Sequence, residues 1–268
     1  NVQLRSQTDN EFWFAAPEIS YELVSPSPVL FQNLDRPIML YITTYQGPAI
    51  VTIDQPANSS FVPIQVTVQT DSTKGVNLTP FIDLVENKPA NAVLNYGLRI
   101  RSSQPVNVFY EVQSDENEES FSLKGKNALG YEFIIPSQHH LQNNPYANPA
   151  ARNSFIVVAT EDSTIVNIFS SADIEGHVRN DTFAVPLNKG QTYCARAISG
   201  DSTAHLGRSL VMADKPVAVT VSDDLVFIPG IDNHAFDLAG DQLVPKNVSS
   251  SSYIVLDAMN GGSPIKPR

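Results

Sequence analysis

Cysteine is nearly absent from this sequence, which has Cys194 alone among its 268 residues. A chain with one thiol cannot form an internal disulfide, so the core must hold the fold together. Such a chain is typical of a reducing compartment, or of a bacterial exported protein large enough to need no cross-link. The sequence also lacks an apolar run of the ~18 residues that cross a membrane as a helix. We therefore expect no direct membrane insertion in this segment.

Positive charge is scarce as well. Lys and Arg number 17 against 28 Asp and Glu, which gives a formal net charge of −11 and a pI near 4.8. An acidic surface repels phosphate backbones and anionic lipids. The charge balance therefore disfavours nucleic acid as a partner.

Amphipathic helical patterns longer than two turns are missing, and the sequence instead alternates apolar and polar residues. Residues 97–112, GLRIRSSQPVNVFYEV, and residues 207–222, GRSLVMADKPVAVTVS, share one layout. Each runs from a glycine through a short apolar strand and a polar turn to a proline, and then into an alternating strand. This alternation is typical of half-buried strands, and proline is tolerated at the first position of a strand.

A second pair of segments repeats in the same order. YITTYQGPAIVTI at 41–53 resembles VVATEDSTIVNI at 157–168, with an offset of 115 residues between the aligned isoleucines. Both read as two apolar strands joined by a tight polar turn, which is the pattern of a hairpin.

A third motif occurs three times at intervals of about 120 residues: NEFWFAAP from Asn10, GYEFIIPS from Gly130 and SSYIVLDA from Ser251. Repeats of this length are whole domains rather than solenoid units. Together with the two pairs above, they indicate that the chain contains two copies of one strand order.

The repeats set the predicted domain boundaries. We predict one unit over residues 1–127 and a second over 128–268, with 251–268 either the start of a third unit or a closing strand. Many short strands separated by turn residues are typical of β-sandwiches. The predicted fold is all-β, with two tandem β-sandwich repeats of jelly-roll or immunoglobulin-like type.

Several segments of the second unit resemble a known family: FIVVATEDSTIVNI, VPLNKGQTY, GRSLVMADKPVAVTVSDD, DLAGDQLVP and SSYIVL. They are similar to the IgGFc-binding-protein N-terminal domain family, as found in bacterial cell-surface and gliding-associated proteins. The resemblance covers most of residues 130–256, and the first unit fits more loosely. It implies repeated β-sandwich modules, export, an adhesive or structural role and no enzyme activity. The paired cysteines of the animal members are not present here.

The densest acidic group follows the second repeated strand and comprises Asp223, Asp224, Asp232, Asp237 and Asp241. One interpretation is a Ca²⁺ site, because this ion takes six to eight oxygen ligands, although the spacing is not that of an EF-hand. The other is a solvated loop at the end of a core strand, in which Asp237 and Asp241 cap turns through backbone N–H groups. We favour the loop and keep these five residues as candidate binding residues.

The sequence gives little support for a zinc site, for nucleophilic catalysis or for a sugar-stacking platform. The five histidines lack zinc-site spacing, and there is no G-x-S-x-G motif. We expect Cys194 to be a buried thiol within a strand. Trp13 is either a sugar-stacking platform or a core residue, and we favour the core because Trp is usually buried. A hydrolase would need a deep pocket joining Ser or Asp to a histidine.

The sequence thus predicts a non-enzymatic, exported module at the cell surface or outside the cell, with the periplasmic face as a further setting. We expect end loops at 139–153, 171–182 and 223–241 to contact a host or cell-surface protein or glycan. The alternative is a carbohydrate- or calcium-binding module of a surface glycan system. We expect a longer form of the protein to carry a signal peptide and an anchor or further repeats.

Overall fold

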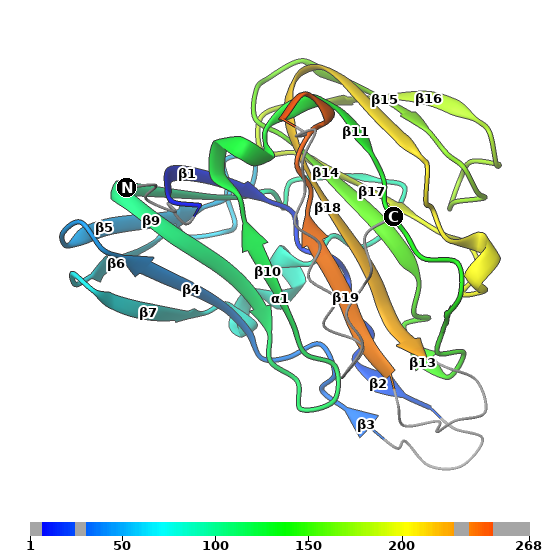
Figure 1. Cartoon of the computed structure of the whole chain (residues 1–268), viewed down its shortest axis with the longest axis horizontal. Coiled ribbons are helices and arrows are strands. Elements are labelled where there is room, and N and C mark those ends of the chain that lie inside the picture. The colour runs from blue at the N-terminus through cyan, green and yellow to red at the C-terminus, as the bar shows by residue number, and fades with distance from the viewer. Residues whose placement is uncertain (1–6, 25–30, 228–235, 249–268) are drawn as a thin grey trace, which may run out of the picture.

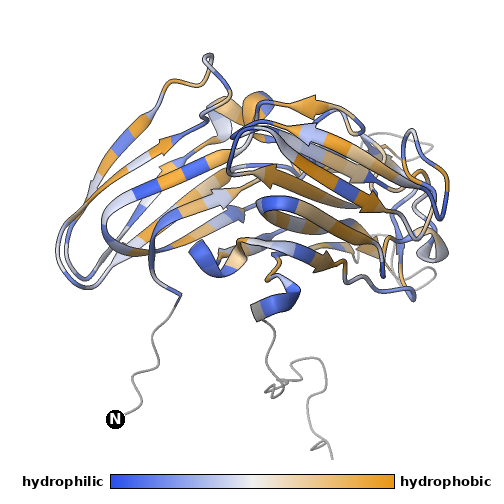
Figure 2. Cartoon of the chain, turned by 90° about the horizontal axis from the view of Figure 1, so that it is seen from above, coloured by the Kyte–Doolittle hydropathy of each residue, from blue (hydrophilic) through white to orange (hydrophobic). Residues whose placement is uncertain are grey.

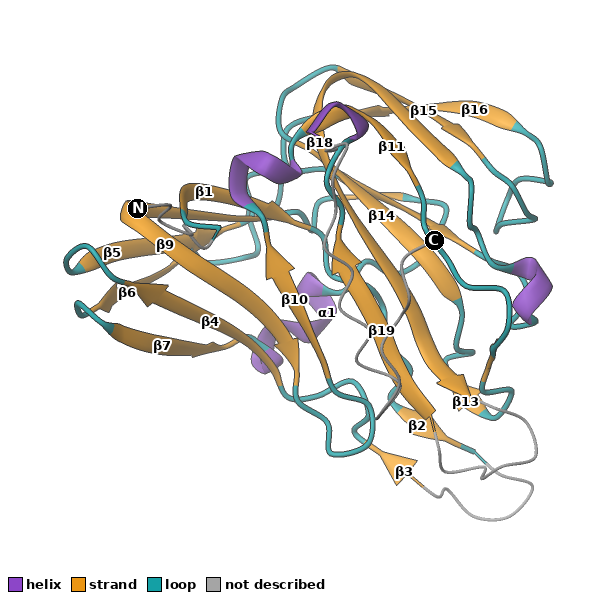
Figure 3. Ribbon diagram, in the orientation of Figure 1, coloured by secondary structure: helices purple, strands orange, loops and turns teal. Residues whose placement is uncertain are grey.

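The computed structural model describes residues 7–24, 31–227 and 236–248 (Figure 1). The predicted all-β fold is confirmed, because strands make up almost all of the regular structure in these ranges (Figure 3). The helical pieces are short: α1 (Ile82–Val85) and the 3₁₀ turns η1 (Thr79–Phe81), η2 (Gly125–Ala128), η3 (Ser202–Ala204) and η4 (Lys246–Val248).

The first body is built around the long strand β9 (Leu98–Val112). The first half of β9 pairs with β1 and β5, and its second half pairs with β4 and β10. A single strand therefore belongs to both layers, and the sheet folds over its own apolar face. The other strands of this sheet are β1 (Asp9–Phe14), β4 (Ile38–Thr44), β5 (Ala49–Asp54), β6 (Ile64–Val68), β7 (Ser72–Asn77) and β10 (Glu119–Leu123).

The second body is built in the same way around β18 (Leu210–Phe227). In Figure 1 it occupies the right half of the molecule, beside the first body. Its sheet also contains β8 (Val93–Leu94), β11 (Gly130–Ile134), β12 (Gln142–Asn143), β14 (Asn153–Ala159), β15 (Thr164–Phe169), β16 (Thr182–Leu187), β17 (Thr192–Arg196) and β19 (Phe236–Gln242).

The two long strands have equivalent neighbours. Val106 of β9 pairs with Asp9 and Thr44, and Val217 of β18 pairs with Gly130 and Ala159. The register shift that follows Asp9 in β1 recurs after Gly130 in β11. The segments that look alike in the sequence therefore occupy matching places in the two sheets, and the third segment, from Ser251, lies outside the described residues.

The two bodies also exchange segments. β8 comes from the first half of the chain and pairs with β17 of the second sheet. A small third sheet joins β2 (Glu22–Leu23) and β3 (Phe31–Gln32) to β13 (Ala147–Asn148). The boundary near residue 127 remains a prediction. In the folded protein, strands from the two halves of the chain pair with each other.

Each body has its own apolar core, and a third cluster lies between them. Phe12 and Phe14 of β1 point into the first core, whereas Trp13 on the opposite face of that strand belongs to one cluster with Ile156 and Val158 of β14. We call this third cluster the seam: Trp13, Ala15, Ala90, Ala128, Ile156, Val158, Cys194 and Ala218. Figure 2 shows the hydrophobic stretches of the strands gathered in the middle of the molecule.

The seam decides two predictions from the sequence. Trp13 is 2% exposed and belongs to the core, so the core interpretation is confirmed and a sugar-stacking role for this residue is wrong. Cys194 is a buried free thiol, as expected, and burial raises its pKa to about 12.

Removing the indole ring from the seam should destabilise the protein strongly. We expect Trp13→Ala to lower the free energy of unfolding by about 3–5 kcal/mol, because it leaves a cavity between two packed bodies. Urea denaturation measures the change. The control is Val178→Ala at a side chain that is 70% exposed, which should change stability by less than about 0.5 kcal/mol. Similar losses in both variants would contradict a stabilising seam.

Candidate functional site

The structure corrects the position of Asp223 and Asp224. They do not end a strand at a solvated rim, because β18 continues to Phe227 and both side chains are buried. The reason is that β12 and β19 pair with this end of β18 and cover it. Of the predicted end loop at 223–241, residues 223–227 and 236–241 belong instead to β18 and β19, and residues 228–235 lie outside the described ranges.

Asp224 joins the second body to the first. Its Oδ2 accepts hydrogen bonds from the Ser20 amide at 2.9 Å and from the Ser20 hydroxyl at 2.5 Å. Its Oδ1 accepts a longer one, at 3.3 Å, from Asn117 Nδ2. Desolvation raises the pKa of Asp224 to about 6, and the bonds from Ser20 oppose that rise. The carboxyl group therefore connects segments that lie far apart in the chain.

Asp223 points to the other side of the strand and pairs with a buried histidine. His205 Nδ1 lies 3.3 Å from Asp223 Oδ2 and 3.0 Å from the carbonyl oxygen of Gln138. His205 Nε2 lies 3.1 Å from Asn143 Oδ1, and the Asn143 amide in turn donates to Asp223 Oδ1 at 2.8 Å. Nδ1 also lies 3.1 Å from Gln138 Nε2, so both ring nitrogens of His205 are held by hydrogen-bonding partners.

This histidine is enclosed by residues without a nucleophile. The side chain of His205 is 0% exposed, and the residues bonded to its ring, namely Gln138, Asn143 and Asp223, carry no hydroxyl or thiol. A serine hydrolase needs a histidine nitrogen that accepts the proton of a hydroxyl. His205 and Asp223 belong to a buried polar network with Gln138 and Asn143.

The remaining predicted site residues do not converge on one ligand. Asp237 Oδ1 and Asp241 Oδ1 accept from the next backbone amide within β19, rather than capping turns. Asp223 and Asp241 line one cavity of about 460 Å³, and Asp237 lines another. Asp232 lies outside the described residues. Within residues 7–24, 31–227 and 236–248, no three His, Cys, Asp or Glu side chains gather as metal ligands.

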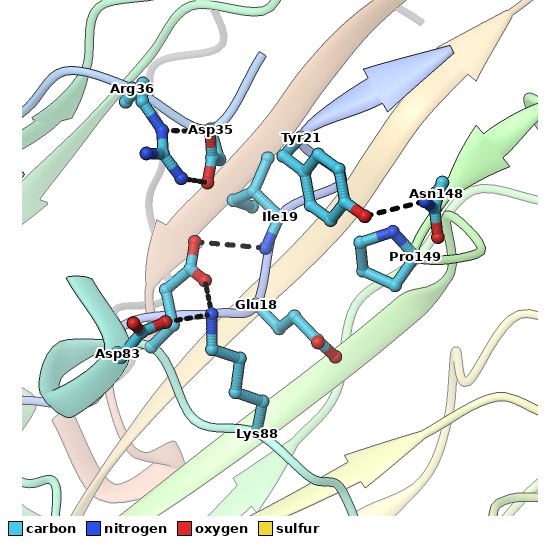
Figure 4. A pocket seen from close by; sticks show the side chains of 10 residues that line it. Glu18, Ile19, Tyr21, Asp35, Arg36, Asp83, Lys88, Asn148 and Pro149 are labelled. Carbon is cyan, nitrogen blue, oxygen red and sulfur yellow. Dashed lines mark hydrogen bonds and ion pairs between the residues drawn. The ribbon is translucent and has the colours of Figure 1, made fainter. Parts of the chain in front are cut away.

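A pocket that the sequence did not predict lies where the two halves of the chain meet (Figure 4). We call it the junction pocket, and its volume is about 360 Å³. Its lining comes from the turn after β1, the turn before β4, α1 with the turn after it, and the end of β13. The lining residues are Glu18, Ile19, Tyr21, Asp35, Arg36, Asp83, Glu86, Lys88, Asn148 and Pro149.

Ion pairs fix the walls of the junction pocket. Arg36 Nε and Nη2 donate to the two oxygens of Asp35 at 2.8 and 2.7 Å. Lys88 Nζ lies between Asp83 Oδ1 at 3.1 Å and Glu86 Oε2 at 3.0 Å. These pairs form the left side of the view in Figure 4. Because each ion is held by a partner, the polar groups are arranged before any ligand arrives.

Glu86 is the most perturbed acid of the junction pocket. Its side chain is 1% exposed, and desolvation raises its pKa to about 8, against the lowering effect of Lys88. Removing a carboxyl from water disfavours its charged form. Burial therefore favours the protonated form of Glu86 at neutral pH.

Tyr21 forms the aromatic wall of the junction pocket. Its side chain is 42% exposed, and its hydroxyl accepts a hydrogen bond from Asn148 Nδ2 at 2.7 Å (Figure 4). Asn148 and Pro149 belong to the predicted contact loop 139–153, so that loop does reach a cavity. Tyr146 of the same loop is 45% exposed.

Comparison with known proteins identifies the family. A profile described as IgGFc binding protein matches residues 119–266, which is more than half of the chain. The chain belongs to the IgGFc binding protein family. The match spans β10 to β19, and of the junction pocket it includes Asn148 and Pro149 only. No curated protein and no solved structure matches the chain. No helix in the part of the chain that the structure describes could cross a membrane.

Burial of Glu86 should make stability depend on pH. Because its folded-state pKa of about 8 lies above the ordinary 4.5, the folded chain holds this proton more tightly than the unfolded chain does. The stabilising contribution is complete below pH 4.5 and is lost as pH rises through 8. We expect a loss of about 2 kcal/mol in unfolding free energy between pH 6 and 8, measured by urea denaturation.

Glu86→Gln removes the titrating group and should flatten this profile. The control, Glu116→Gln, changes an exposed carboxylate and should keep the slope of the wild type. A Glu86→Gln variant that is as sensitive to pH as the wild type would show that another group is responsible.

The bond between Ser20 and Asp224 should appear as a coupling energy. In a double-mutant cycle of Ser20→Ala and Asp224→Asn at pH 7.5, we expect about 1–3 kcal/mol, because charge-assisted hydrogen bonds in a buried place are strong. The matched control is the exposed pair Thr43–Thr73, whose hydroxyls lie 2.7 Å apart. That pair should couple by less than about 1 kcal/mol. Equal coupling in both cycles would argue against a tie between the bodies.

Proposed function

We propose that the protein is a non-enzymatic, exported adhesion or structural module that binds a protein partner at the cell surface. The family match over residues 119–266 carries this proposal, because the family is described by its binding to another protein. Two fused β bodies form a rigid support, and the contact surface lies on segments at their ends.

The best-supported contact surface is the end of the molecule that carries loop 139–153. Three large side chains there are exposed: Tyr21 at 42%, Val24 at 43% and Tyr146 at 45%. Val24 and Tyr146 are neighbours, because the amide of Val24 donates to the carbonyl of Tyr146 at 2.7 Å. Aromatic residues are enriched where proteins bind one another. We call Tyr21, Val24 and Tyr146 the end patch.

Two observations favour a module without catalytic activity. Both ring nitrogens of His205 are engaged by Gln138 and Asn143 in the interior, and the high pKa of Cys194 keeps its thiol in the protonated form. Nucleophilic catalysis requires a thiolate, or a hydroxyl beside a free base. These two residues therefore support a structural use of the second body.

A binding screen tests the proposal. The purified chain is immobilised and exposed to an immunoglobulin G Fc fragment, to a mucin and to the same mucin after enzymatic removal of its glycans. We expect saturable binding to at least one of these, weakened at least tenfold in the double variant Val24→Ala/Tyr146→Ala, since truncating a central aromatic anchor has effects of that size.

The matched control variant is Tyr45→Ala/Ile50→Ala, which removes side chains that are 55% and 53% exposed on the hairpin of β4 and β5. It should bind as the wild type does. Equal weakening in both variants would place the contact elsewhere, and no saturable binding to any probe would overturn the proposal.

A further inference from the structure

All the charges that line the junction pocket are already neutralised by partners within the chain. Asp35 is paired with Arg36, and Lys88 bridges Asp83 and Glu86. Glu18 Oε2 accepts from Arg196 Nη1 at 2.8 Å. A ligand therefore meets a polar wall without an unpaired charge.

The wall nevertheless keeps hydrogen-bonding capacity of both kinds. Arg36 has five N–H groups, and Asp35 uses two of them. The hydroxyl of Tyr21 accepts from Asn148 and keeps its own proton for donation. Asp83, whose side chain is 86% exposed, contacts Lys88 through one oxygen only. The lining thus offers both donors and acceptors to a ligand.

These properties select the chemistry of the ligand. The two cations of the lining are not free to hold an anion, because Asp35 binds Arg36 and Asp83 and Glu86 bind Lys88. A cation would have to compete with Lys88 and Arg196, which already hold the carboxylates. An apolar molecule would leave buried polar groups unpaired, which costs free energy. A neutral molecule that carries many hydroxyl groups can donate and accept at every position.

The ring of Tyr21 supplies an aromatic face against which a ligand can pack. Its hydroxyl is anchored by Asn148 (Figure 4), so the ring is held in place with much of its surface open. The C–H face of a sugar ring packs against an aromatic face while the hydroxyl groups around its edge reach polar side chains. We propose that the junction pocket binds a neutral sugar unit of a glycan.

This inference rests on the proposed binding function and names the ligand chemistry at the same end of the molecule. The volume of about 360 Å³ lies at the lower limit of pockets that hold small ligands. Ion pairs hold Arg36 and Lys88 in place beforehand, so little side-chain freedom is lost when the ligand binds. A partner that carries glycans would then meet the end patch and the junction pocket together.

Titration with free sugars tests the inference without a partner. Glucose, galactose, mannose and N-acetylglucosamine, each with its disaccharides, are added to the labelled chain, and amide shifts are followed by NMR. Glucosamine and N-acetylneuraminate serve as the cationic and anionic comparators. We expect saturable shifts around Tyr21 with at least one neutral sugar, and binding at least tenfold weaker with both charged comparators.

Variants separate stacking from hydrogen bonding. Tyr21→Ala should weaken sugar binding by about tenfold, whereas Tyr21→Phe keeps the ring and should retain most of it. Asp83→Asn should weaken binding by a smaller factor, and Tyr45→Ala, at an exposed ring on another hairpin, should leave it unchanged.

The outcomes distinguish this inference from the proposed function. Tighter binding of glucosamine than of any neutral sugar, or sugar binding that survives Tyr21→Ala, would overturn it. If no sugar binds while a protein probe binds at the end patch, the sugar site is refuted and the module stands. If neither sugars nor protein probes bind, both the sugar site and the proposed binding function are refuted.

Discussion

The structure depends on one strand that is buried on both of its faces. Every residue of β14 is buried, because Phe155 and Val157 point into the second core while Ile156 and Val158 point into the seam. A strand covered on both sides has an unbroken run of apolar residues in its sequence, and FIVVA at residues 155–159 is such a run. The seam joins the two bodies into one unit, and it helps to fix the relative position of the segments that line the junction pocket.

Polar side chains also form hydrogen bonds across the same contact. Asp224 takes its hydrogen bonds from Ser20 and Asn117, and Gln242 donates to the carbonyl of Trp13 at 2.7 Å. Apolar packing supplies attraction without direction, whereas these bonds specify which residues meet. The junction pocket is a by-product of this arrangement, since its walls are turns that the seam brings together.

Much of the architecture could be predicted from the sequence, because strands follow a local rule. The alternation in residues 97–112 and 207–222 marks β9 and β18, and the repeated phrases indicate matching positions in two sheets. The error at Asp223 and Asp224 has a physical cause. Two adjacent acidic residues usually indicate a solvent-exposed position, but here β12 and β19 cover both side chains. Their equivalents in the first body are Val112 and Gln113, and Val112 is buried, so the alignment carried a signal of burial at Asp223 that its charge outweighed.

The junction pocket lay beyond sequence reasoning for a different reason. Its residues come from four separate turns, and no short motif links Tyr21, Arg36, Lys88 and Asn148. Only the loop 139–153 gave a signal, through its content of Asn and Pro. A site assembled by tertiary packing, with ion pairs between near neighbours in the chain, looks in the sequence like ordinary surface charge.

The buried thiol in the seam has a practical consequence for spectroscopy. Cys194 is buried, and its raised pKa leaves almost no thiolate at neutral pH. Maleimide reagents will therefore not modify this thiol in the folded protein. A fluorophore or spin label can therefore be attached at a single chosen exposed position, for example through Val178→Cys, while the native cysteine stays in place. With one such label on each body, distances between the bodies become measurable without first altering the packing that holds them together.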